Sequence, residues 1–70
     1  MKYVITRALV KFSDGTFDHM NYEEQGILKV CDNVERFRKK LRDDLNKKLS
    51  PLFRVTVTYI RLMYDERPDL

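Results

Sequence analysis

Apolar and polar residues alternate along two stretches of the chain and recur at a helical period along a third. The first alternating stretch covers residues 2–12 and is rich in β-branched and aromatic types, which predicts a β-strand. Asp14-Gly15 follows, and this dipeptide favours a tight hairpin because glycine adopts positive φ without steric cost. A two-residue turn predicts a register that pairs Phe12 with Phe17, Lys11 with Asp18, Val10 with His19, and Leu9 with Met20.

Apolar residues spaced three or four positions apart predict one long amphipathic helix with a single buried stripe. Two helix starts are open, one near Asn21 and one near Asp32, because each residue can cap a helix and has a glutamate three positions later. Ser50-Pro51 is expected to end the helix, since the residue before a proline is disfavoured in the α region. The stripe consists of Ile27, Val30, Val34, Phe37, Leu41, Leu45 and Leu49.

The second alternating stretch, residues 53–64, predicts the last strand. Its apolar residues change sides near Tyr59-Ile60, so either a bulge there or an end that projects past the sheet is expected. The order is β-β-α-β, and a right-handed crossover places the first strand in the middle. We therefore expect an α+β fold in which a three-stranded antiparallel sheet of order 2-1-3 packs in two layers against one long helix. Residues 1–70 form a single domain in this interpretation, with residues 65–70 as a flexible C-terminal tail.

One helix covers only one face of a sheet, yet both faces of the predicted sheet carry apolar residues. Scattered surface hydrophobes are a simple explanation. The alternation favours instead a second apolar surface that contacts another protein or a second copy of the chain, with a twofold dimer as the commonest form of self-association. The candidate interface residues are Tyr3, Ile5, Leu9, Met20, Tyr22, Ile60, Leu62, Met63 and Tyr64.

The net charge of +3 leans toward acidic partners, and basic residues crowd the predicted helix. Several of them follow an acid by four positions, as Lys39 follows Glu35, which is typical of a solvated helix face with internal ion pairs. The basic residues of this region suggest an alternative function in nucleic-acid binding, with Lys29, Arg36, Lys39, Lys40 and Arg42 as candidates. A second route lies on the strands, where Lys2, Arg7, Lys11, Arg54 and Arg61 could meet phosphates and Tyr3 and Tyr59 could stack on bases.

Residues suited to catalysis or metal binding do not form a recognisable site. Asp18 and His19 are adjacent on a strand and therefore point to opposite faces. Cys31 is the single cysteine and His19 the single histidine, which is too few ligands for structural zinc. No cofactor, metal or small-molecule substrate is expected, and no apolar stretch approaches the ~20 residues that cross a bilayer. Together with the unpaired cysteine, this predicts a cytoplasmic protein with no membrane partner.

These patterns favour a small non-enzymatic protein-binding module with an accessory or regulatory role, expected to be a homodimer. Small free-standing domains of this kind are often encoded by phages or mobile elements, which is a background expectation. The alternative is a nucleic-acid-binding module that uses the basic helix.

Overall fold

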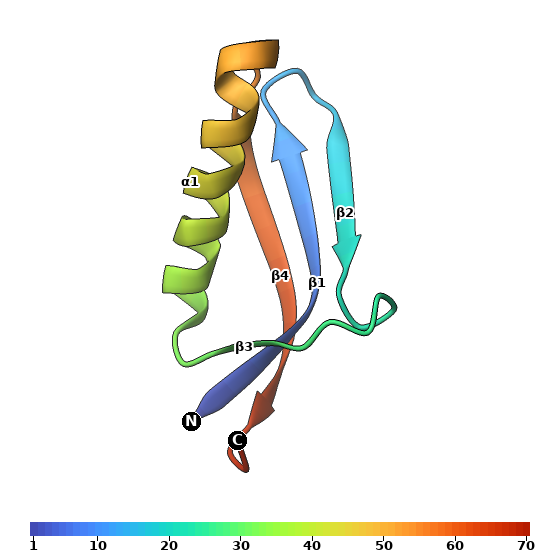
Figure 1. Cartoon of the computed structure of the whole chain (residues 1–70), viewed down its shortest axis with the longest axis vertical. Helices are drawn as coiled ribbons and strands as arrows, with labels where there is room; N and C mark the ends of the chain where they lie inside the picture. Colours follow the sequence, from blue (N-terminus) through green and yellow to red (C-terminus); the bar gives the residue numbers. More distant parts are fainter.

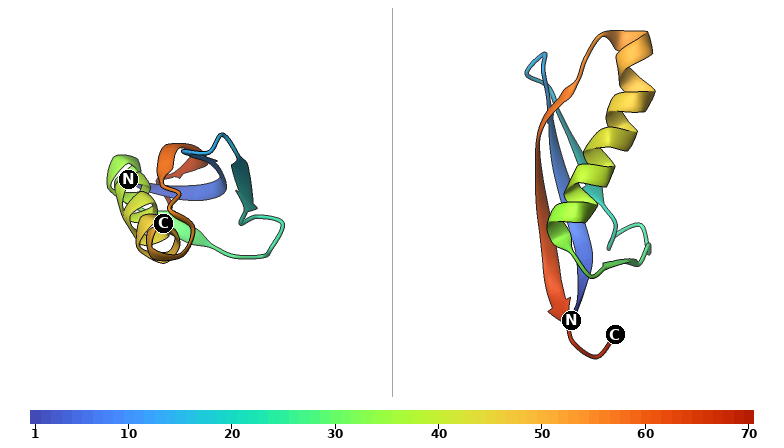
Figure 2. Two further views of the ribbon diagram at one scale, coloured as in Figure 1. Left: turned by 90° about the horizontal axis from the view of Figure 1, so that it is seen from above. Right: turned by 90° about the vertical axis from the view of Figure 1, so that its left-hand side faces the viewer.

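The computed structural model describes the backbone of residues 1–70 and the side chains of residues 1–49 and 54–70. Its elements are β1 (Lys2–Phe12), β2 (Phe17–Asn21), β3 (Lys29–Cys31), α1 (Val34–Phe53) and β4 (Val57–Arg67). β1 is the central strand: β4 pairs antiparallel with one edge, while β2 and β3 pair antiparallel with successive parts of the other. The molecule is elongated, 41 × 22 × 16 Å, with α1 on one side of the twisted sheet (Figures 1 and 2). The expected α+β architecture with one long helix is confirmed.

The register of the hairpin between β1 and β2 differs by one residue from the prediction. Lys11 pairs with Phe17 and Leu9 with His19. The turn is closed by a bond from the Gly15 amide to the Phe12 carbonyl, and Gly15 has a φ of 87°. This is a three-residue loop, in which a tight turn is followed by a residue in the left-handed region. Gly15 therefore follows the turn instead of forming its centre, and this shifts every pair by one.

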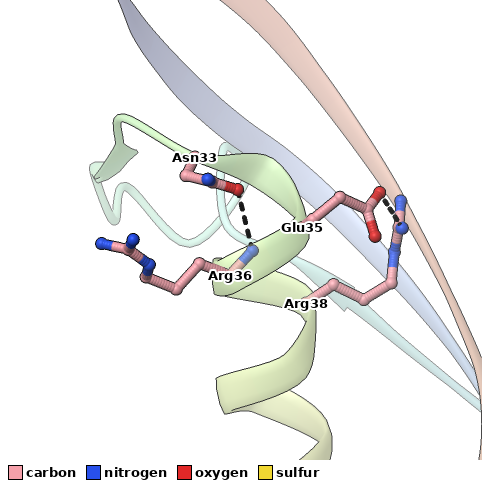
Figure 3. Close-up of polar contacts among 4 residues, drawn as sticks. All are labelled: Asn33, Glu35, Arg36 and Arg38. Atoms are coloured by element: carbon pink, nitrogen blue, oxygen red, sulfur yellow. Dashed lines mark hydrogen bonds and ion pairs between the residues drawn. The ribbon is translucent and has the colours of Figure 1, made fainter.

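The helix begins at the later of the two expected starts. Asn33 caps it, because its side-chain Oδ1 accepts a hydrogen bond of 3.0 Å from the Arg36 amide (Figure 3). Asn21 makes the same kind of contact with the Glu24 amide, at 3.0 Å, but there it caps only a short turn. The expected stripe therefore loses its first two residues: Ile27 lies in the turn region and Val30 lies in β3.

The helix ends three residues later than the sequence predicted. It continues through Pro51 to Phe53, and Arg54 then leaves it with a φ of 53°. A proline deletes one backbone hydrogen bond and crowds the preceding turn, but here the left-handed residue, not the proline, ends the helix. The last strand consequently begins at Val57 and not at residue 53. The side chain of Phe53, the first residue of the predicted strand, lies outside the described side chains.

The core lies between α1 and the face of the sheet that the helix covers. Its buried residues are Ile5, Ala8, Val10, Tyr22, Val57, Ile60 and Leu62, joined by half-buried Phe37, Leu41 and Leu45 from the helix stripe. Ile5 and Ala8 share this face although they are three positions apart, because an irregularity at Thr6 interrupts the pairing of β1 with β4. A second irregularity falls at Thr58, one residue before the bend predicted near Tyr59-Ile60.

Candidate functional site

The face of the sheet that points away from α1 carries three parallel rows of side chains. Ala8 and Val10 are buried under the helix, so their neighbours Arg7, Leu9 and Lys11 point to the opposite face. Each of these three residues pairs with one residue of β2 and one of β4. We call the resulting nine residues the open face; its rows are Asn21–Arg7–Met63, His19–Leu9–Arg61 and Phe17–Lys11–Tyr59.

The open face is accessible to solvent along all three strands. The aromatic rings of Phe17 and Tyr59 are 60% and 53% exposed, and Met63 is 36% exposed. Arg7, Lys11, His19 and Arg61 are exposed as well, while Leu9 and Asn21 are half-buried. Alternate residues of a strand stand about 6.6 Å apart and adjacent strands about 4.8 Å apart. The nine side chains therefore cover a patch of roughly 13 by 10 Å between the outermost backbone positions.

The open face is positively charged. None of its nine residues is a carboxylate, and three of them are permanent cations: Arg7, Lys11 and Arg61. Among the side chains of residues 1–49 and 54–70, none of the three cations has a carboxylate within ion-pair distance. The Lys11 ammonium instead lies 5.7 Å from the centroid of the Phe17 ring. This charge is available to a ligand because no internal partner neutralises it.

The residues expected to form an apolar interface are divided between the core and the surface. Ile5, Tyr22, Ile60 and Leu62 are buried, and half-buried Met20 packs against them, so these five stabilise the domain itself. Leu9 and Met63 lie on the open face. Tyr3 and Tyr64 are on the helix side of the sheet, where their rings pack edge to face at 5.6 Å. The irregularity at Thr6 explains the positions of Tyr3 and Ile5, since it reverses the direction in which the earlier β1 residues point.

The basic residues expected to bind nucleic acid through the helix do not form one surface. Lys29 precedes the helix and lies on β3, with its ammonium 5.6 Å from the centroid of the Tyr22 ring. Glu35 and Arg38 form an ion pair on the side facing β4, and Arg36 points elsewhere (Figure 3). Arg36, Lys39, Lys40 and Arg42 are all exposed, but acids such as Asp43 and Asp44 are interspersed with them.

Several of the basic residues predicted on strands, unlike those of the helix, lie on one surface. Arg7, Lys11 and Arg61 converge on the open face, and Lys2 continues the same face toward the N-terminal end of β1. Tyr59, a candidate for stacking on bases, lies beside Lys11 on this face. Tyr3 does not, since it packs on the helix side. Arg54 belongs to no strand and follows the end of α1.

Two features bear on reactivity. Burial raises the pKa of the Cys31 thiol, which keeps it in the less nucleophilic protonated form at neutral pH. Among the described residues, no group of three or more His, Cys, Asp and Glu side chains is placed to hold a metal ion.

The described part of the chain also has no helix that is both long enough and apolar enough to cross a membrane.

Comparisons with protein-family models, with curated proteins and with solved structures found no match to this chain.

Sequence reasoning missed Phe17 and His19 as members of the surface. Both were assigned to hairpin pairing, and the predicted register placed Phe17 opposite Phe12 and not opposite Lys11. The signal that could have found them is Gly15: a glycine directly after the turn indicates a three-residue loop as readily as a two-residue one. With that loop, Phe17 and His19 share a face with Lys11 and Leu9.

Proposed function

We propose that this protein is a non-enzymatic binding module that takes single-stranded nucleic acid on the open face of its sheet. One observation carries the proposal: Arg7, Lys11 and Arg61, which lack carboxylate partners among the described side chains, lie on one face of the sheet beside the exposed residues Phe17 and Tyr59. An accessory or regulatory role fits a domain of this size, which would act by occupying a strand of nucleic acid.

The two kinds of side chain match the two parts of a nucleotide. Arg and Lys neutralise phosphates, and aromatic rings stack on bases whatever their sequence. A single strand supplies both at once, because its bases are free to turn toward the sheet while its backbone follows the cations. Duplex bases are already stacked on each other, so a duplex would leave the rings of Phe17 and Tyr59 without a partner.

The same charges argue against the open face as a contact between two copies of this chain. A face-to-face dimer would bring Arg7, Lys11 and Arg61 of one copy against the same cations of the other. Removing unpaired cations from water is costly, and like charges across an interface add to that cost. The face also carries the apolar side chains of Leu9, Phe17, Tyr59 and Met63, but each of its three rows contains one of the cations, so no row could be buried without one.

The proposal is tested by removing charge from the open face and, separately, from the helix. One variant carries Arg7→Gln, Lys11→Gln and Arg61→Gln. The matched control carries Arg36→Gln, Lys39→Gln and Lys40→Gln, so both lose the same charge from exposed positions. Binding to a fluorescent single-stranded oligonucleotide of mixed sequence is measured by anisotropy, and folding is checked by circular dichroism.

We expect the open-face variant to lose at least tenfold in affinity and the helix variant to change less than threefold. The log–log salt dependence of the wild-type protein should have a slope of about −2, since each of three neutralised phosphates contributes about −0.7 on a single strand. A larger loss of affinity in the helix variant than in the open-face variant would place the binding site on the helix. A wild-type protein that binds no oligonucleotide at low salt would refute the proposal and favour a protein ligand for this face.

A further inference from the structure

The outer edge of β4 is an open pairing surface. β4 pairs with β1 from Val57 to Arg67, and no other strand in the described chain pairs with its second edge. Figure 1 shows β4 at the border of the sheet, with α1 alongside it. An edge strand of eleven residues presents a row of unpaired amides and carbonyls, which is a template for adding a strand. These backbone groups must therefore be hydrogen-bonded by solvent or by another strand.

The surroundings of this edge are polarised along its length. A groove between the helix and the strand is lined by Arg38, Arg42 and the first part of β4, residues 58–62. The far end of β4 carries the exposed acids Asp65 and Glu66, and the neighbouring Arg67 is already paired with Asp69. The helix runs antiparallel to the strand, and a hydrogen bond of 2.7 Å from the Val57 amide to Asn46 Oδ1 fixes their alignment. Because Arg38 is paired with Glu35, the groove end of the edge keeps one cation, Arg42, with no ion-pair partner among the described side chains, and the far end keeps the acids Asp65 and Glu66.

A second copy of the same chain fits this polarity. Two β4 edges related by a twofold axis perpendicular to the sheet pair antiparallel, and each residue faces one on the same side of the sheet. The longest overlap is centred on Leu62, the middle residue of β4. In that register, Glu66 of the second copy stands opposite Thr58, which lines the groove together with Arg42. The symmetry makes the contact twice.

We infer that this protein forms a twofold dimer through the β4 edges, with Glu66 of each copy placed against Arg42 of the other. The two sheets join into one continuous sheet, and both helices lie on the same side of it. The two open faces then lie on one common surface, which doubles the length of strand that can be contacted. The dimer itself does not depend on the proposed nucleic-acid binding, since β4 contributes backbone groups to the dimer and the charges that align it, Glu66 and Arg42, lie outside the open face.

Charge exchange tests the dimer without any ligand. The nuclease-treated protein is studied by analytical ultracentrifugation over a wide concentration range, together with the variants Glu66→Arg, Arg42→Glu and the combination of both. Each single change replaces two attractive contacts with two repulsive ones, so the dimer dissociation constant should rise about tenfold or more. The combined variant restores opposite charges and should return the constant to within about threefold of the wild type.

The control exchanges charges away from the edge, with Glu24→Arg and Lys40→Glu, and should leave dimerisation unchanged. Circular dichroism of every variant confirms that it is folded, and the combined variant excludes misfolding as the cause of any loss. A wild-type protein that is monomeric at all concentrations refutes the inference. A dimer that tolerates both single changes, or that the combined variant does not restore, is built on another surface and also refutes it.

Discussion

The Lys11 ammonium lies 5.7 Å from the centroid of the Phe17 ring, its cross-strand neighbour on the open face. The contact exists because the three-residue loop ending at Gly15 sets the register one position from that of a two-residue turn. In the shorter turn, Lys11 would face Asp18 and its charge would be neutralised. The loop thus keeps a cation beside an aromatic ring, which is the pairing that a nucleotide can use.

The aromatic rings of the open face should contribute to binding independently of charge. We expect Phe17→Ala and Tyr59→Ala each to weaken oligonucleotide binding by about 1–3 kcal/mol, the usual loss for one stacked base. Tyr64→Ala is the matched control, since Tyr64 is similarly exposed, at 43%, but packs against Tyr3 on the helix side. Anisotropy titrations at one salt concentration compare the three. Equal losses in all of them would show that stacking on the open face is not the cause.

Arg54 is a site where the fold can be stabilised. Its φ of 53° is strained for a residue with a Cβ and free of strain for glycine. Arg54→Gly should raise the free energy of unfolding by about 0.5–1 kcal/mol, after the greater flexibility of glycine in the unfolded chain is offset. Arg54→Ala keeps the Cβ and should give no such gain. Urea denaturation measures both variants, and a glycine variant no more stable than the alanine variant would contradict this backbone.

The helix start can be checked at its cap. Asn33→Ala removes the bond to the Arg36 amide and should lower the free energy of unfolding by about 1 kcal/mol. Asp32→Ala should cost less than half of that, because Asp32 precedes the cap and its contribution is limited to the charge near the helix N-terminus. Thermal and urea denaturation distinguish the two. A larger loss for Asp32→Ala would move the start of the helix by one residue.

Tyr22 should make the protein sensitive to alkali. Burial raises the pKa of its hydroxyl, which donates a hydrogen bond of 3.4 Å to the Met20 sulfur. The pKa of Tyr22 in the folded protein is above its value of about 10 in the unfolded chain. The buried neutral hydroxyl therefore contributes fully to the free energy of unfolding below pH 10, and this contribution is lost as the pH rises through the folded pKa. Tyr22→Phe should therefore lose less stability between pH 9 and pH 11 than the wild type does. Parallel losses in the two proteins would contradict the effect of burial.

The hairpin strands, the long helix with its buried face and the last strand could be predicted from the sequence, because alternation and helical spacing are local patterns, but the additional strand β3 could not. The faces of β1 could not, since the irregularity at Thr6 places Ile5 and Ala8 on the same side. Straight alternation put Ile5 on the second face, and a one-residue slip reverses every side chain. β3 is only three residues long, and its Val30 also fits the spacing of the helix stripe, so Val30 was predicted as a helix residue.

The candidate site was only partly visible for the same reason. Arg7, Lys11, Arg61 and Tyr59 were recognised as strand residues, but their convergence depends on pairs that form across β1. Phe17 joined them only once the hairpin register was known. The pairing of residues across strands depends on loop length and on the positions of bulges, and a single sequence predicts both only weakly.

The most direct test of the binding surface is residue-resolved. Backbone amide resonances of the isotope-labelled protein are followed by nuclear magnetic resonance while a single-stranded oligonucleotide is added. We expect the largest shifts on residues 7–11, 17–21 and 59–63, the three strand segments of the open face. Shifts concentrated on residues 34–49 would place the ligand on the helix and contradict it.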